Sequence, residues 1–238
     1  MRLLVRTWNL FHGNADPPRR TGYLRRMVEL VTADGPDVVC LQEVPVWALP
    51  LIDDWSGMRR FDAVTRAPLW PGPLSTWVTR MHQGFFRSGL AGQANAILVA
   101  PAHAATDLGH ERVSDARRER RVVHAVRIAG SPGVTVGNLH LSNDFVEPRV
   151  PCAEAVRAAS FVAEAAMPDD VVVLAGDFNV GDPGLDGYTG PLEGIDHVLT
   201  RGADGMTVVV WPRERRKQNG IVLSDHPIVE AQLEVVRP

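Results

Sequence analysis

Acidic, amide and imidazole side chains recur in this sequence at the ends of short apolar segments. The clearest case is Asp177-Phe178-Asn179, which follows the apolar run Val171–Leu174. The other polar residues placed in this way are Asn9, Glu43, His140, Asp196, His197, Asp225 and His226. Residues just past strand ends gather at one rim of a sheet, where functional sites usually lie.

Carboxylates that gather at one rim repel each other, and a hard divalent cation relieves the repulsion. We therefore expect a Mg²⁺ site, with Mn²⁺ as the alternative ion. The chain has only two cysteines, Cys40 and Cys152. This count argues against a cysteine zinc site and against a disulfide framework, and it favours the cytoplasm.

The composition excludes several classes of protein. The chain has 238 residues, of which 45% are hydrophobic and 22% are charged, which is unlike a disordered chain. No apolar run approaches the ~20 residues of a membrane span, and the N-terminal residues do not resemble a secretory signal. The net charge of −3 argues against a protein that coats nucleic acid without regard to sequence.

The elements that must position these residues alternate between strand and helix at first and are rich in strands later. A strand over 3–8, a helix over 24–31 and a strand over 38–41 form a β-α-β unit, and a short helix follows over 46–55. A longer helix is expected over 153–167. The further strands are expected at 95–99, 122–128, 134–141, 171–174, 195–200, 206–211 and 228–235. About nine strands with three or four helices predict one α/β domain over residues 1–238, with two packed sheets.

The span 68–92 is irregular and carries Trp70, Trp77, Phe85 and Phe86. We interpret it as a packed flap. The alternatives are a surface that stacks bases and a loop that contacts lipid.

Taken in order, the polar motifs resemble the endonuclease/exonuclease/phosphatase superfamily, which has the deoxyribonuclease I-like fold. The matching motifs extend from residue 7 to residue 227, so the resemblance covers nearly the whole chain. They are Thr7-Trp8-Asn9, Leu41-Gln42-Glu43-Val44, Asn95-Ala96-Ile97-Leu98, Asn138-Leu139-His140-Leu141, Gly176-Asp177-Phe178-Asn179, Ile195-Asp196-His197 and Ser224-Asp225-His226-Pro227.

The resemblance implies a four-layer α-β-β-α sandwich of two mixed sheets flanked by helices, and metal-dependent hydrolysis of a phosphoester. It implies that Glu43 is the main metal ligand, with Asn9 and Asp225 near the ion. In the same way, Asp177 would orient or deprotonate the attacking water, and Asn179 would contact the phosphate.

Two imidazoles complete the implied site. His226 would face the phosphate, paired with Asp196, which would fix its tautomer and favour its cation. His140 would be the second imidazole that faces the phosphate. In deoxyribonuclease-like members a Glu supports the equivalent of His140, whereas this chain offers only Gln93 and Asn95 nearby.

A second departure concerns Phe11, which occupies the position where abasic-site endonucleases carry an Asp. Together with the presence of His140, this weakens an interpretation as an abasic-repair enzyme. His197 is interpreted as structural. The unmatched histidines, interpreted as surface or satisfied residues, are His12, His82, His103, His110 and His124.

Arginine supplies 24 of the 25 basic residues, and only Lys217 is a lysine. The planar guanidinium fork suits phosphate. Arg120 and Arg121 open the strand before the one that contains His140, and Arg215 lies in the segment before Asp225. We name these three as candidate phosphate contacts, although charge runs more often face solvent.

The leading hypothesis is a monomeric Mg²⁺-dependent phosphodiesterase or nuclease that acts on DNA or RNA. A phosphodiesterase or phosphatase of lipid or inositol phosphates, similar to sphingomyelinases, is the second hypothesis, and it leaves open a peripheral contact with lipid. A catalytically silent binding protein on the same fold is the third.

Overall fold

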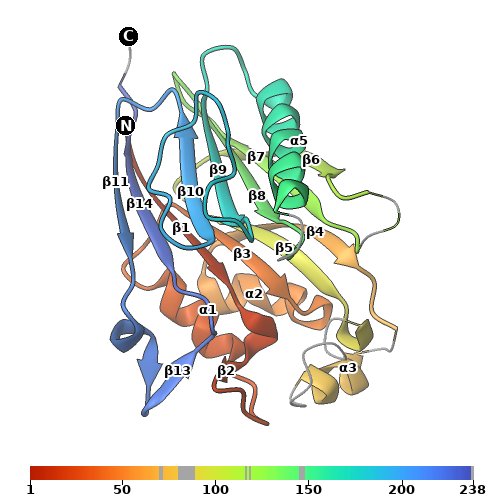
Figure 1. Ribbon diagram of the computed structural model, residues 1–238. Helices are drawn as coiled ribbons and strands as arrows, with labels where there is room; N and C mark the ends of the chain where they lie inside the picture. The colour runs from red at the N-terminus through yellow and green to blue at the C-terminus, as the bar shows by residue number, and fades with distance from the viewer. Residues whose placement is uncertain (70–71, 80–88, 116, 118, 145–147, 237–238) are drawn as a thin grey trace.

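Two mixed β-sheets pack face to face (Figure 1), and the computed structural model describes residues 1–69, 72–79, 89–115, 117, 119–144 and 148–236. The first sheet has the strand order β11 (Gly205–Val210), β14 (Val229–Glu234), β1 (Arg2–Asn9), β3 (Val38–Val44), β5 (Gln93–Val99) and β4 (Arg59–Arg66). The second has the order β10 (Asp196–Arg201), β9 (Val171–Asp177), β8 (Val134–His140), β7 (Val122–Ile128) and β6 (Ala105–Arg112). β1 is parallel to β3 and β8 to β9, whereas the other neighbouring strands are antiparallel.

The buried strands are apolar on both faces because each sheet is covered twice. In β3, Val38 and Cys40 face the second sheet, whereas Val39 and Leu41 face the helices on the other side. This explains why β3 appears in the sequence as a continuous apolar run.

Helices form the two outer layers of the molecule. α1 (Leu24–Thr32) and α2 (Leu49–Ser56) pack on the first sheet, and α5 (Arg149–Ala165) packs on the second (Figure 1). The four-layer α-β-β-α sandwich expected from the sequence is therefore confirmed. None of the helices within the described ranges combines the length and apolar content needed to cross a bilayer.

A polar bridge crosses the interior between the two sheets. The side-chain Nδ2 of Asn138, on β8, donates hydrogen bonds to the carbonyl oxygens of Leu41 and Ala96 at 3.0 and 2.9 Å. Gln42 Nε2 donates to Asn138 Oδ1 at 2.7 Å. Because all these groups are buried, losing one partner would cost about 1–3 kcal/mol. The bridge therefore fixes how the two sheets lie directly below the site.

A small third sheet organises the loops beyond the main sheets. It contains β2 (Ala15–Asp16), β13 (Ile221–Leu223) and β12 (Lys217–Gln218), the last of which follows the 3₁₀ turn η3 (Arg213–Arg216). β2 and β13 join the segment after β1 to the segment before Asp225.

Two strands of the main sheets and the three short strands of the third sheet were not indicated by the sequence. Both β4 and β6 lie at sheet edges, where alternate side chains face solvent, so neither has a continuous apolar run. The span 68–92 contains the helix α3 (Gly72–Thr79), on which Trp77 is 57% exposed. Trp70, Phe85 and Phe86 lie outside the described residues, so the expected flap is described only in part.

Candidate active site

The ends of five strands bring polar side chains from both sheets to one rim. Asn9 ends β1, and Glu43 lies near the end of β3. On the second sheet His140 pairs in register with Asp177, and Asp177 with Asp196. Asn9 Nδ2 donates a hydrogen bond to Asp177 Oδ2 at 2.9 Å, so the two sheets meet at this carboxylate.

Strained backbone is concentrated at the same rim. Seven non-glycine residues of the described chain have a positive φ, and five of them lie here with φ between 47° and 58°: Phe11, His12, Glu43, Asn179 and Ser224. Such a conformation costs on the order of 1–3 kcal/mol per residue and is typical of functional sites. The backbone at the rim is therefore locally destabilised in the conformation that orients these side chains.

Asp177 is the centre of the cluster and is 1% exposed. Its Oδ1 accepts a hydrogen bond from the backbone N–H of Asn179 at 3.0 Å, and its Oδ2 lies 3.4 Å from His140 Nε2 and 3.8 Å from His226 Nε2. Burial and the neighbouring charge of Asp196 raise the pKa of Asp177 to about 7. This carboxylate is therefore poised to exchange a proton near neutral pH.

Gly176 allows Asp177 to reach this position. Its φ is +150°, and a Cβ atom there would lie 2.0 Å from the carbonyl oxygen of Leu139. β9 can therefore pass this close to β8 only with glycine before Asp177.

His226 forms a pair with Asp196 at the open side of Asp177. His226 Nδ1 lies 2.9 Å from Asp196 Oδ2. Burial alone would lower the pKa of this imidazole, but the hydrogen bond and charge of Asp196, with the charges of Asp177 and Asp225, raise it to about 10. His226 is therefore a cation at neutral pH.

His140 differs from His226 both in its partner and in its charge state. The amide nitrogen Nε2 of Gln93 lies 3.3 Å from His140 Nδ1, and both side chains are buried. Burial and then the positive charge of Arg121 hold the pKa of His140 well below its ordinary value. His140 is therefore neutral at neutral pH.

Glu43 is paired with a residue that sequence reasoning left unmatched. His12 Nδ1 lies 2.7 Å from Glu43 Oε2. Burial would raise the pKa of the Glu43 carboxyl, but the charge and hydrogen bond of His12 outweigh burial and lower the pKa well below its usual range. Glu43 is therefore ionised at neutral pH. The sequence signal that could have indicated a site role for His12 is its position three residues after Asn9, in the turn Phe11-His12-Gly13.

Two sets of groups at the rim have the chemistry to hold a divalent ion. Ligand atoms of Asp177, Asp196 and His226 all lie within 4.8 Å of one another. The cationic state of His226 opposes metal binding by its ring, because a ligating imidazole must be neutral. The second set is Glu43 with Asp225: burial and the charge of Glu43 raise the pKa of Asp225, whose side chain is 47% exposed. An oxygen-seeking cation would relieve that repulsion.

The family model for the Endonuclease/Exonuclease/phosphatase family matches residues 7–226. The chain belongs to this family. A search of the curated proteins finds no match.

Solved structures of the family share the fold at low sequence identity. TDP2 from Caenorhabditis elegans is 17% identical, with a TM-score of 0.71 over 99% of this chain and 76% of that one. A Bacteroides thetaiotaomicron family member is 14% identical, with a TM-score of 0.68 over 100% and 97% of the two chains. A TDP2 from D. rerio, complexed with a single-strand DNA product, is 14% identical, with a TM-score of 0.64 over 98% and 99%. At these identities the structures establish the shared fold.

The candidate phosphate contacts named from the sequence lie at different distances from the cluster. Asn179 is close, and its Nδ2 donates to the carbonyl oxygen of Leu141 at 2.9 Å. Arg121 is near enough to lower the pKa values of Glu43 and His140. Arg120 is exposed at the surface.

Arg215 lies over Trp211, with its guanidinium carbon 3.3 Å from the ring centroid. Its Nη2 lies 4.0 Å from Asp34 Oδ2. Within the described part of the chain, the contacts of the Arg215 guanidinium are therefore with Trp211 and Asp34, and none is with a residue of the cluster. Its neighbour Arg216 is buried and donates to the carbonyl oxygens of Leu223 and Ser224 at 3.0 and 3.1 Å. Arg216 thus supports the turn that carries Asp225, a role that the charge run did not indicate.

Both the nitrogen and the oxygen of the Asn9 side-chain amide make a hydrogen bond. Its Nδ2 donates to Asp177, and its Oδ1 accepts from the backbone N–H of Phe11 at 3.0 Å. Asn9 therefore orients Asp177, while one lone pair of Oδ1 stays available. His197 Nε2 lies 2.9 Å from the carbonyl oxygen of Val180, and its ring packs edge-on against Phe178, which is a structural environment.

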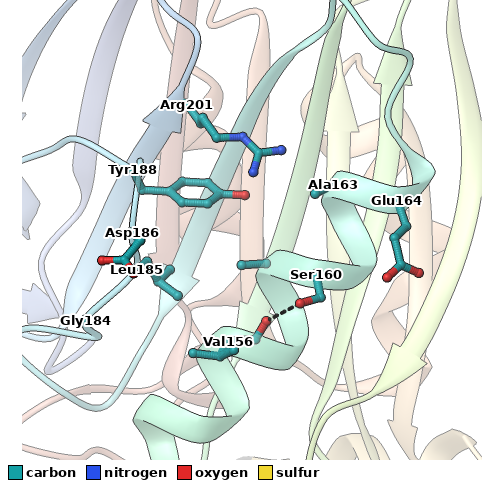
Figure 2. Close-up of a pocket in the computed structure, with 10 residues that line it drawn as sticks. Val156, Ser160, Ala163, Glu164, Gly184, Leu185, Asp186, Tyr188 and Arg201 are labelled. Carbon is teal, nitrogen blue, oxygen red and sulfur yellow. Dashed lines mark hydrogen bonds between the residues drawn. The ribbon is translucent and has the colours of Figure 1, made fainter.

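A cavity of about 360 Å³ lies away from the rim, between α5 and the segment after β9. Figure 2 shows Arg201 above the ring of Tyr188 in this cavity. None of the rim residues lines it.

Proposed function

We propose that this family member is a Mg²⁺-dependent phosphodiesterase that hydrolyses nucleic acid by attack of water at phosphorus. The observation that carries the proposal is Asp177, a buried carboxylate with a pKa of about 7, held between a cationic and a neutral imidazole. Such a group can accept a proton from water at neutral pH, and a positioned general base contributes roughly 10²–10⁴-fold to rate.

The surrounding side chains have separate roles in this proposal. Asn9 and the backbone N–H of Asn179 orient the Asp177 carboxylate. The His226 cation, held by Asp196, faces the phosphate and stabilises its negative charge. His140 donates a hydrogen bond as a neutral imidazole, and the Asn179 side chain and Arg121 lie close enough to contact phosphate oxygens.

Glu43, Asp225 and the free lone pair of Asn9 Oδ1 form an all-oxygen donor set, which is the kind that Mg²⁺ or Mn²⁺ prefers. When bound, such an ion polarises a phosphoryl oxygen and stabilises charge on the leaving oxygen. The His12 side chain keeps Glu43 ionised and directed toward the rim.

Nucleic acid is favoured as the substrate class by the similar TDP2 structure that holds a single-strand DNA product. The alternative of a lipid or inositol phosphate has its own support, because Leu69, Leu74 and Trp77 in and beside α3 are exposed. We extend the proposal to a cytoplasmic location, since both cysteines are free, as expected where thiols stay reduced.

The test is a substrate panel with Mg²⁺ or Mn²⁺: single- and double-stranded DNA, RNA, a generic phosphodiester, sphingomyelin and inositol phosphates. We expect cleavage of nucleic acid that EDTA abolishes, and a fall in kcat of about 10³-fold in Asp177→Asn. Equal rates for the wild type and Asp177→Asn, or activity that is insensitive to EDTA, would contradict the mechanism. If only sphingomyelin or the inositol phosphates were hydrolysed, the substrate class would be a lipid or inositol phosphate and not nucleic acid.

A further inference from the structure

A second cavity, among α1, α2 and α3, shares His12 with the site. Its volume is about 260 Å³. We call it the indole pocket, and its main lining residues are His12, Leu24, Trp47, Trp55, Thr76 and Thr79. For scale, an apolar cavity of about 150 Å³ accommodates benzene. The indole pocket therefore has room for a single flat ring system.

The walls of the indole pocket are flat and largely apolar. Trp47 and Trp55 are half-buried and pack against the core beneath the helices. Trp47 Nε1 donates to Thr79 Oγ1 at 2.9 Å, and the hydroxyls of Thr76 and Thr79 donate to carbonyl oxygens within α3. These polar groups are thus already satisfied, and the walls present mainly ring faces and methyl groups.

Two side chains in this wall, Arg25 and His12, are exceptions: Arg25 is exposed to solvent and its Nε is paired with Glu29, whereas His12 is buried. The residue is 4% exposed, and its Nδ1 is paired with Glu43. Its Nε2 is buried without a hydrogen-bond partner among the described residues. A buried polar atom of this kind requires an explanation, and a ligand that offers a hydrogen-bonding edge to Nε2 provides one.

We propose that the indole pocket binds one unpaired nucleobase of the substrate, with its ring against the indoles and its edge hydrogen-bonded to His12 Nε2. This inference rests on the proposed function, because the base belongs to the strand whose phosphate occupies the rim. The two sites are one imidazole apart, since His12 contacts Glu43 with one nitrogen and lines the pocket with the ring.

The proposal makes single-stranded nucleic acid the preferred form. A base inside a duplex is paired and stacked, so it must leave the helix before it can enter a pocket. Stacking on aromatic side chains tolerates any base. The indole pocket therefore selects for an unpaired position next to the cleaved bond and discriminates weakly among the four bases.

The first experiment measures the pocket without phosphate or metal. Adenosine and cytidine are titrated into the protein in EDTA while NMR follows the indole N–H signals, assigned with Trp47→Phe and Trp55→Phe. We expect both nucleosides to shift the signals of Trp47 and Trp55, and ribose to leave them unchanged. Thr76→Phe fills the pocket and should abolish the shifts, whereas Trp77→Phe, on the exposed side of the same helix, should keep them.

Three results of this titration would overturn the proposal. The first is that ribose shifts the signals as much as the nucleosides. The second is that toluene, a flat ring without a hydrogen-bonding group, binds as tightly as they do, which would mean that the hydrogen-bonding edge is irrelevant. The third is that the shifts persist in a folded Thr76→Phe protein, with folding checked by its thermal unfolding midpoint.

The second experiment uses cleavage of oligonucleotides. With the wild type we expect kcat/KM to fall about tenfold when the base next to the cleaved bond is replaced by an abasic site. Thr76→Phe should cut both substrates equally while still cleaving a generic phosphodiester. If the protein binds nucleosides but cuts no nucleic acid, the pocket stands and the proposed function fails. If it cuts nucleic acid with no loss at the abasic site, the pocket proposal fails and the function stands.

Discussion

The two imidazoles beside Asp177 show how a partner decides the charge of the same side chain. His226 has the carboxylate of Asp196 at 2.9 Å, and His140 has the amide of Gln93 at 3.3 Å. Burial opposes the cation in both. The carboxylate overcomes burial and raises the pKa of His226 to about 10, whereas the amide does not, and the pKa of His140 stays well below its ordinary value.

The difference in charge gives His226 and His140 different roles at the rim. A permanent cation suits the stabilisation of phosphate charge, and a neutral imidazole donates one hydrogen bond without adding charge. Asp177 lies between them, and its pKa reflects both neighbours as well as its burial. Changing either partner should therefore alter the charge of one imidazole and leave the other in place.

The largest expected effect comes from Asp196→Asn, which makes the His226 side resemble the His140 side. Without the carboxylate, the pKa of His226 falls from about 10, so the descending alkaline limb of the kcat/KM profile moves toward neutral pH. At neutral pH we expect kcat to fall about 10²-fold. The measurements are the pH–rate profile and an NMR titration of the histidine Cε1–H signals in EDTA.

A control for this variant is Asp204→Asn, because Asp204 is a distant carboxylate that accepts a hydrogen bond from the Val236 backbone. It should leave both the profile and the His226 titration unchanged. If His226 still titrated near its wild-type pKa in Asp196→Asn, the carboxylate would not be the source of its charge.

The sequence alone was sufficient to predict the parts of the site that lie at the ends of strongly apolar strands. The two packed sheets, the rim and the positions of Asp177 and His140 follow from the apolar runs, whereas the four-layer arrangement came from the family resemblance. The roles of Asp196, His226 and Glu43 came from the family resemblance and stay predictions until they are tested by mutation.

Contacts made only through tertiary structure could not be predicted in this way. His12 meets Glu43 because the turn after β1 bends with a positive φ, and no local pattern encodes that partner. Arg216 and Arg215 are adjacent in a charge run, yet one is buried beneath the Ser224 turn and the other stacks on Trp211. The edge strands β4 and β6 were not indicated because exposed alternate positions dilute their apolar signal.

A smaller effect is expected from Gln93→Glu, which makes the His140 side resemble the His226 side. A carboxylate next to His140 Nδ1 raises the pKa of His140 and favours its cation. That cation, beside Asp177, lowers the pKa of Asp177 from about 7. Because Asp177 must be ionised to act as a base, the ascending acidic limb of kcat/KM moves to lower pH, with rates at neutral pH changed by less than about tenfold.

Gln93→Leu separates charge from shape, since it removes the hydrogen bond without adding a carboxylate. It should leave the acidic limb where the wild type has it. Identical profiles for the Glu and Leu variants would mean that the partner of His140 does not set its charge.

The smallest expected effect concerns a third pair, His124 with Asp107, which limits the rule drawn from the first two. His124 Nε2 lies 2.9 Å from Asp107 Oδ1, yet burial outweighs this carboxylate and lowers the pKa of His124. Asp107 is itself half-exposed, so solvent screens its charge, whereas Asp196 is buried. A carboxylate partner therefore fixes an imidazole cation only when it is itself shielded from water.

The pH dependence of stability tests this limit. Because the folded pKa of His124 lies below that of the unfolded chain, the unfolded state binds more protons as the pH falls below about 6.5, and stability decreases. His124→Gln removes this contribution, so its free energy of unfolding should fall less steeply than that of the wild type between neutral pH and about pH 5. Urea unfolding across this range, with catalytic rates as a control that should stay unchanged, measures the slope. An equal slope in the two proteins would mean that folding leaves the pKa of His124 unchanged, so that Asp107 fully offsets burial. A steeper fall in the variant than in the wild type would mean that the exposed carboxylate holds His124 as a cation in the folded state.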